Sequence, residues 1–198
     1  LENNTYLIAD EETGQAAIID PSFEREPIID IINQYKYLPK YILITHAHFD
    51  HTVNAIALSD QFSPPVPIAL HPSDLQLWEN GSGAEFFGTQ FKPDRSPDLN
   101  LYHRQKILLG DQEIEVRHVP GHSPGSLVFV LHSNQLVLTG DLIFYRGVGR
   151  TDLPGGNVTH LMKSITSQIF SLPGNYQLLP GHGPSTTVAE EIRFNPYI

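Results

Sequence analysis

Short apolar runs, closed by glycine, proline or polar turns, recur from one end of this chain to the other. Runs of this length are typical of β-strands, and stretches with helical periodicity follow several of them. In the first half, the predicted order is two strands, a helix, a strand, a helix, a strand and a helix. In the second half it is four strands, a helix, a strand and a helix. This repeated order predicts an α+β fold in which two sheets pack face to face with helices outside.

The predicted elements can be placed along the sequence. Strands are expected at Thr5–Ala9, Gln15–Asp20, Tyr41–Thr45, Val66–Leu70, Gln105–Leu109, Gln112–Val119, Leu127–Leu131, Leu136–Thr139 and Tyr176–Leu179. Helices are expected at Glu24–Lys36, from near His51 to Leu58, and at Ser73–Trp78, Thr159–Phe170 and Thr187–Phe194. Pro39 is expected to end the first helix. Residues Glu79–Asn100 lack a clean period, which predicts a loop with one helical turn. Phe86, Phe87 and Phe91 in this loop are candidates for the core or for a hydrophobic lid over the functional site, and we favour the core for at least one of them.

Size and charge exclude several classes of protein. At 198 residues the chain has the length of one domain, and we expect a single domain over residues 1–198. Its 12 Lys and Arg against 22 Asp and Glu give a net charge of −10, which argues against nucleic acid or an anionic membrane as a partner. No apolar stretch has the length of a membrane span. The chain begins at Leu1 without an initiator Met or a signal peptide, so we expect a trimmed sequence, and we expect a cytoplasmic location.

The segment Thr45–His51 reads Thr-His-Ala-His-Phe-Asp-His and contains four candidate metal ligands. It follows an apolar strand and opens a predicted helix. In extended backbone His46 and His48 point to the same side, whereas Asp50 and His51 lie in the following turn and can face a second point nearby. A polar loop with Asp50 as a helix cap is the simpler explanation, but four such side chains so close together are costly unless a cation compensates them. Nitrogen and carboxylate donors, in a chain without cysteine, suit zinc, iron or manganese.

Three later segments share one pattern, in which an apolar strand is followed by glycine and then a single polar residue. The polar residues are His122, Asp141 and His182. Glycine at these places lets the backbone approach a neighbouring group closely. Each residue alone is more often a hydrogen-bonded surface residue. Together with the first motif they supply five histidines and two aspartates, which is enough for two metal ions that share one carboxylate.

These motifs resemble those of the metallo-β-lactamase superfamily, and within it the glyoxalase II-like hydrolases. The resemblance extends from Asn4 to Pro196 and implies an αββα sandwich of two mixed β-sheets flanked by helices, with a dinuclear site at one edge. The first motif differs from that of flavodiiron proteins, which carry a glutamate at its second position. The commonest subclass of β-lactamases has a cysteine ligand, and this chain has none. The resemblance implies that His46, His48 and His122 bind the first metal, that Asp50, His51 and His182 bind the second, and that Asp141 bridges them.

A further run, Gly149-Arg150-Thr151-Asp152, is similar to short bacterial glyoxalase II-like hydrolases and to persulfide dioxygenases. Glyoxalase II has a lysine at the position of Arg150 that engages a carboxylate of glutathione, which makes Arg150 a candidate substrate-binding residue. An Arg150–Asp152 pair that ties down the loop is an equally good explanation. Full-length glyoxalase II also has a C-terminal helical region with glutathione contacts, whereas this chain ends at Ile198, so glutathione specificity stays open.

The resemblance implies a metal-dependent hydrolase that cleaves a thioester of the S-acylglutathione type by attack of a hydroxide that bridges two metals. Asp50 and Asp141 would be the catalytic carboxylates, and two Zn²⁺ per chain the expected cofactor, with iron or manganese as alternatives. The expected partner is a small-molecule thioester, and the oligomeric state is left open.

Two other functions stay open at this point. A persulfide dioxygenase with a single Fe²⁺ would use His46, His122 and Asp141 as iron ligands. A metal-binding module without catalysis is the third reading, although the presence of all seven ligands argues against it.

Overall fold

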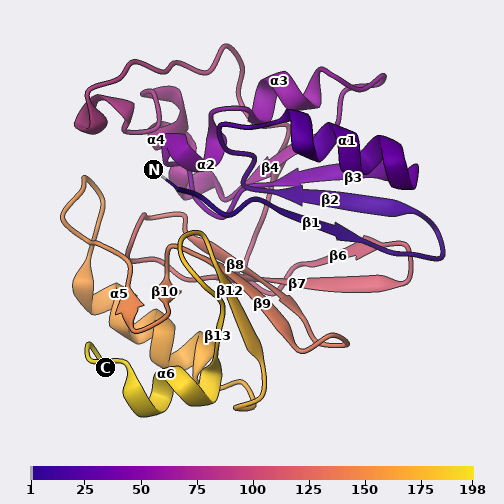
Figure 1. Cartoon of the computed structure of the whole chain (residues 1–198). Helices are drawn as coiled ribbons and strands as arrows, with labels where there is room; N and C mark the ends of the chain where they lie inside the picture. Colours follow the sequence, from indigo (N-terminus) through magenta and orange to yellow (C-terminus); the bar gives the residue numbers. More distant parts are fainter. Residues whose placement is uncertain (1) are drawn as a thin grey trace.

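Two β-sheets pack face to face in the computed structural model, which describes residues 2–198 (Figure 1). In order across the first sheet, the strands are β1 (Tyr6–Ala9), β2 (Gln15–Ile19), β3 (Leu38–Leu43), β4 (Ile68–Leu70) and β5 (Leu99–Asn100). In order across the second, they are β13 (Thr186–Thr187), β12 (Gln177–Pro180), β9 (Leu136–Gly140), β8 (Leu127–Leu131), β7 (Gln112–His118) and β6 (Lys106–Leu109). A short separate ladder joins β10 (Ile143–Phe144) to β11 (Gly147–Val148).

Both sheets are mixed. In the first, β1 and β2 form an antiparallel hairpin, while β2, β3, β4 and β5 run parallel to one another. In the second, β12 is parallel to β9, and the other neighbouring pairs are antiparallel. It follows that β7, β9 and β12 run in the same direction, so the segments that leave their carboxyl ends emerge at one edge of this sheet.

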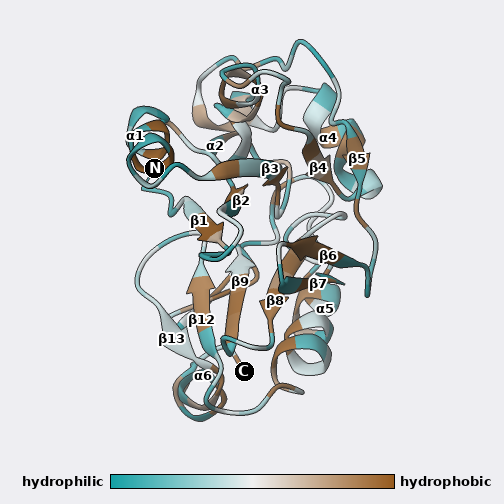
Figure 2. Ribbon diagram, turned by 90° about the vertical axis from the view of Figure 1, so that its right-hand side faces the viewer, coloured by the Kyte–Doolittle hydropathy of each residue, from teal (hydrophilic) through white to brown (hydrophobic). Residues whose placement is uncertain are grey.

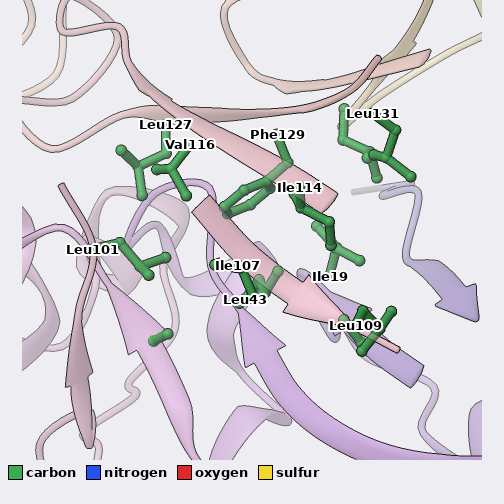
Figure 3. Close-up of a cluster of buried hydrophobic side chains, with 13 residues drawn as sticks. Ile19, Leu43, Leu101, Ile107, Leu109, Ile114, Val116, Leu127, Phe129 and Leu131 are labelled. Carbon is green, nitrogen blue, oxygen red and sulfur yellow. The ribbon is translucent and has the colours of Figure 1, made fainter. Parts of the chain in front are cut away.

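The strand β8 shows why the molecule has four layers. All of its residues are buried, because both faces of the second sheet are covered. Leu127 and Phe129 point into the apolar cluster between the two sheets (Figure 3), whereas Val128 and Val130 belong to a cluster on the opposite face. Successive side chains of a strand alternate between faces, so one continuous apolar strand serves two cores.

Helices cover the outer face of each sheet. Over the first sheet lie α1 (Glu26–Tyr35), α3 (Ala55–Ser59) and α4 (Leu75–Glu79), and over the second lie α5 (Val158–Ser164), its π-helical continuation Ile165–Ile169, and α6 (Val188–Phe194). In α1, Ile28 and Ile32 are one turn apart and both face inward. In Figure 2 the hydrophobic colouring is strong on β8 and β9, whereas the helices carry mixed colours. Single helical turns complete the set: α2 (Phe49–Thr52), η1 (Pro72–Asp74) and η2 (Ala84–Phe87).

The expected αββα sandwich of two mixed sheets is confirmed, and each expected strand and helix has a counterpart in the structure. The helix expected from near His51 to Leu58 is interrupted, so α2 and α3 are separate. The strands β5, β10, β11 and β13 were missed. Each has two residues, which is too short for a periodic pattern in the sequence.

The expected role of Pro39 was wrong. The helix α1 ends at Tyr35, because Lys36 adopts a left-handed conformation with φ of 56°. Pro39 instead lies within β3, opposite Ala16, where the register between β2 and β3 shifts. A proline has no N–H to donate, and an irregularity in the ladder accommodates it.

The expectation that at least one phenylalanine of the long loop lies in the core was also wrong. Phe86 is 52% exposed and Phe87 is 38% exposed, and Phe91 is only partly buried. The η2 turn lies between Gly83 and Gly88, both in left-handed conformations that lead the chain out and back. Phe87 packs against Phe49 with ring centroids 5.3 Å apart.

None of the helices within residues 2–198 combines the length and the apolar character that a bilayer crossing requires.

Candidate metal centre

The seven residues singled out in the sequence meet at one edge of the sandwich, although they come from segments far apart in the chain. His46 and His48 follow β3, and Asp50 and His51 lie in α2. The other three, His122, Asp141 and His182, follow the carboxyl ends of β7, β9 and β12. Because these three strands run in one direction, the residues that follow them gather at the same edge.

His46, His48 and His122 form the first group of converging donors. The Nε2 atom of His122 lies 2.9 Å from Nδ1 of His48 and 3.1 Å from Nε2 of His46. All three side chains are buried, and their donor atoms lie within 4.8 Å of one another. The structure thus brings together the three residues that were expected to bind the first metal.

Asp50, His51 and His182 form the second group. The Nε2 atom of His182 lies 3.3 Å from Oδ2 of Asp50, and Nε2 of His51 lies 3.9 Å from the same oxygen. The carboxylate of Asp141 lies between the two groups. Its Oδ1 is 3.4 Å from Nε2 of His51, and its Oδ2 is 3.7 Å from Nε2 of His122 and 3.5 Å from Nε2 of His182. This is the place expected for a shared ligand.

Outer hydrogen bonds fix which ring nitrogen of each histidine faces the cluster. The Nδ1 atoms of His51 and His122 donate to Oδ2 of Asp20 and to the carbonyl oxygen of Arg150, each at 2.8 Å. His182 donates through Nδ1 to the carbonyl oxygen of Glu2. The Nδ1 atom of His46 lies 3.0 Å from Oγ1 of Thr45, a hydroxyl whose proton goes to Asp20. In the neutral form of each of these histidines the Nε2 lone pair therefore faces the cluster.

Those lone pairs fit a bound cation. The nitrogens of His46 and His122 that face each other both carry lone pairs, which repel unless a positive charge lies between them. Nε2 of His51 and Oδ1 of Asp141 are buried and have no hydrogen-bond partner among the described residues. Buried polar atoms are nearly always paired, and a metal ion would pair both. The donor set, nitrogen and carboxylate without sulfur, suits zinc, iron or manganese.

Burial and mutual repulsion keep part of the cluster in its metal-binding protonation state. Burial and the neighbouring imidazoles lower the pKa of His48 to about 3 and hold the pKa of His46 well below its usual value. Burial also opposes charge on His51, but the carboxylates of Asp141 and Asp20 outweigh it and raise the pKa of His51. Although burial opposes ionisation of Asp141, the imidazoles of His51 and its neighbours hold the pKa of this carboxyl below its usual range.

Asp20 is a residue of the site that the sequence pattern did not reveal. Its buried carboxylate accepts hydrogen bonds from the backbone N–H and the hydroxyl of Thr45, at 2.7 and 2.6 Å, as well as from His51. It thereby orients one ligand directly and the His46 segment through Thr45. The only signal in the sequence is a lone aspartate after an apolar strand, without the glycine that precedes Asp141.

Glycines shape the floor of the cluster. A Cβ atom on Gly181 would lie 2.4 Å from Oδ1 of Asp141 and 2.6 Å from Cε1 of His51. A Cβ atom on Gly149 would lie 1.9 Å from the carbonyl oxygen of Asp141. Neither approach is possible for any other residue without displacing Asp141.

The N-terminal segment fastens the loop that carries His182. The backbone N–H of Asn4 donates to the carbonyl oxygen of Gly181 at 2.7 Å, and its side chain donates to that of Gly183 at 2.8 Å. The hydroxyl of Tyr6 donates to the carbonyl oxygen of Pro180 at 2.7 Å. The first strand and the residues before it therefore hold a loop near the other end of the chain.

Arg150 forms an ion pair with Asp152, which was one of the two explanations offered for this arginine. Its Nε and NH2 atoms donate to the two carboxylate oxygens of Asp152 at 2.8 and 2.6 Å, and both side chains are at least half exposed. Its carbonyl oxygen is the partner of His122. A role of the guanidinium in substrate binding stays a prediction.

An αββα sandwich with converging histidines and aspartates at one edge defines a class of metalloproteins, and the sequence comparisons identify the family. The model of the metallo-beta-lactamase superfamily matches residues 1–183. The chain therefore belongs to the metallo-beta-lactamase superfamily, and its His and Asp clusters fit a binuclear site for the divalent metals that this superfamily binds.

Individual relatives cover nearly the whole chain. It is 35% identical over 199 residues to the hydroxyacylglutathione hydrolase GloC of Haemophilus influenzae, covering 100% of this chain and 93% of the relative. The crystal structure of TTHA1623 in a di-iron-bound form superposes with a TM-score of 0.89 at 36% identity, covering 100% and 96% of the two chains. That of the BLEG-1 B3 metallo-beta-lactamase superposes with a TM-score of 0.91 at 33% identity, covering 98% and 93%.

Proposed function

We propose that this protein hydrolyses thioesters of the S-acylglutathione type with two metal ions, zinc in the first instance. The observation that carries the proposal is the pair of donor groups that flank the single carboxylate of Asp141. The similarity to a relative named hydroxyacylglutathione hydrolase supports the substrate class.

Two bound divalent cations would lower the pKa of coordinated water from about 15.7 toward roughly 7 and stabilise negative charge on a thioester carbonyl oxygen. The contribution of the chain is to hold them in place. His46, His48 and His122 would hold one, and the second would be held by Asp50, His51 and His182. Asp141 would contact both. Its lowered pKa keeps the carboxylate ionised and able to bind cations throughout the neutral range.

The dioxygenase alternative needs only His46, His122 and Asp141. Nε2 of His122 lies 2.9 Å from Nδ1 of His48 but 3.7 Å from Oδ2 of Asp141. The donor atoms of the three-histidine group therefore lie closer together than those of the dioxygenase set. A mononuclear site would also leave the convergence of Asp50, His51 and His182 without a purpose. These distances support a dinuclear site over the mononuclear site of the dioxygenase, and the substrate assay below separates the hydrolase from a module without catalysis.

Metal analysis and substrate assays on protein purified without added metal test the proposal. We expect about two metal ions per chain, and release of free thiol from S-lactoylglutathione. A β-lactam should be tested in parallel, because one solved neighbour is named a B3 metallo-beta-lactamase. One iron per chain, with oxygen consumption on glutathione persulfide, would instead establish the dioxygenase. A two-metal protein that releases no thiol from any thioester would refute the proposal.

The role of Arg150 can be tested with paired substrates. If its guanidinium binds a substrate carboxylate, Arg150→Ala should raise KM for a glutathione thioester about tenfold or more, because hydrogen bonds to charged groups contribute about 1.5–3 kcal/mol. KM for a thioester of an uncharged thiol should change little. Asp152→Ala is the matched control, since it breaks the same pair but leaves the guanidinium free. Equal losses on both substrates, or similar drops in Tm for both variants, would favour a purely structural pair.

A further inference from the structure

A fully buried carboxylate, Asp74, lies behind the three-histidine group. It ends the η1 turn that follows β4, and its side chain is 0% exposed. Burial raises the pKa of Asp74, against the opposing effect of its hydrogen bonds from Ser123 and from the backbone of Ala47 and Gly125. A buried carboxyl is unfavourable unless its oxygens are well bonded, so its partners indicate its purpose.

Those partners belong to the two segments that carry the three histidines. Oδ2 of Asp74 accepts from the backbone N–H of Ala47, the residue between His46 and His48, at 3.0 Å. The same oxygen accepts from the hydroxyl of Ser123, the residue after His122, at 2.7 Å. The two segments lie more than seventy residues apart in the chain, and this carboxylate connects them alongside the hydrogen bond from the backbone N–H of Leu127 to the carbonyl oxygen of Thr45.

The second oxygen strengthens the same connection. Oδ1 of Asp74 accepts from the backbone N–H of Gly125, in the turn that follows His122, at 2.5 Å. A Cβ atom on Gly125 would lie 2.7 Å from Cγ of Asp74, so glycine is required for this approach. The turn is fixed by Ser126. Its hydroxyl oxygen accepts a hydrogen bond from the backbone N–H of Ser123 at 3.0 Å and lies 2.8 Å from the hydroxyl oxygen of Ser123.

We infer that Asp74 is a positioning residue that sets the spacing of His46 and His48 against His122 and so determines the metal affinity of the three-histidine group. Asp74 contacts none of the proposed ligand atoms and acts through the backbone on either side of them. The inference rests on the metal ligands of the proposed function, but not on the thioester as substrate.

The test measures zinc affinity, without any substrate, by competition with a chelator of known affinity. The first background is His182→Ala, which removes a ligand of the second group and leaves the three-histidine group intact. In this background Asp74→Asn should weaken zinc binding about ten- to a hundredfold, because the loss of an outer partner of a metal ligand usually costs that much affinity. Asparagine keeps the volume of the aspartate side chain, but its NH2 group cannot accept a hydrogen bond. The backbone N–H of either Ala47 or Gly125 therefore loses its acceptor. In a His48→Ala background, which removes the three-histidine group, Asp74→Asn should change zinc affinity less than about twofold.

Glu191→Gln is the matched control for general loss of stability. Glu191 is also 0% exposed, and it accepts from the hydroxyl of Thr186, the backbone of Arg146 and the side chain of Asn195. It contacts none of the seven proposed ligands. We expect this control to lower Tm and to leave zinc affinity unchanged.

The inference is overturned if Asp74→Asn leaves zinc affinity unchanged in the His182→Ala background, or if Glu191→Gln weakens it equally. It is also overturned if protein with the intact three-histidine group binds no zinc. Should Asp74→Asn fail to fold, Ser123→Ala decides the matter, because it removes one of the three hydrogen bonds and should weaken zinc binding several-fold. Absence of thioester hydrolysis would refute the proposed function and leave this result standing.

Discussion

Replacing Asp141 by alanine is expected to remove most of the hydrolytic activity and to lower the metal content below two ions per chain. Among residues 2–198, Asp141 is the only one whose carboxylate lies within 4 Å of donors from both groups, namely His51, His122 and His182. Loss of an outer partner of a ligand typically costs about 10–100-fold in affinity or activity. Loss of a ligand shared by two ions should cost at least the upper end of that range.

Metal content by elemental analysis and thiol release from S-lactoylglutathione check this expectation on the same sample. Asp111→Ala is a suitable control, because it removes the same charge from an exposed turn between β6 and β7. An Asp141→Ala protein that kept two metals and full activity would contradict the dinuclear assignment.

Acidification is expected to remove metal, activity and thermal stability together, over a narrow pH range. Five of the seven proposed ligands are histidines, which bind metal only when neutral, so protons and metal compete for the same nitrogens. Because several protonations are linked to two ions, metal release should be steep in pH.

The metal-free chain should also lose stability in acid, and the sign follows from the lowered pKa of His48. The unfolded chain protonates a histidine at about pH 6.5, whereas folded His48 resists protonation down to about pH 3. Between these values the unfolded state binds more protons, so the free energy of unfolding falls as the pH falls. The raised pKa of His51 acts in the opposite direction but at higher pH. Between about pH 6.5 and that raised pKa the folded state binds more protons, so the stability gained there as the pH falls is already complete below about pH 6.5.

Excess Zn²⁺ separates competition from other effects of acid. It should shift the midpoints of activity and of Tm to lower pH, and a chelator at neutral pH should abolish activity as acid does. If activity were lost while two metals per chain remained bound, titration of a catalytic group would be the cause instead.

The sequence could predict the candidate site because its strongest part is local. His46, His48, Asp50 and His51 are neighbours in the chain, and their positions after an apolar strand indicate a common purpose. The remaining three required a weaker argument, in which His122, Asp141 and His182 share the pattern of strand, glycine and polar residue.

Asp20 and Asp74 could not be recognised in the same way. Each is a single aspartate at the end of a strand or turn, where aspartate is common for reasons of local capping. What distinguishes them is the set of distant donors that the fold brings to their oxygens, and no spacing in the sequence records it. The short strands escaped prediction for a related reason, since a two-residue ladder depends on its partner rather than on its own pattern.

The fastening of the His182 loop by Asn4 and Tyr6 has a practical consequence for anyone who handles this protein. An affinity tag fused before the first residues, or a protease that removes them, disturbs the segment that hydrogen-bonds to Pro180 and His182. His182 is a proposed metal ligand, although it lies far from this segment in the sequence. Preparations that differ only in their first residues can then differ in metal occupancy and be mistaken for distinct enzymes.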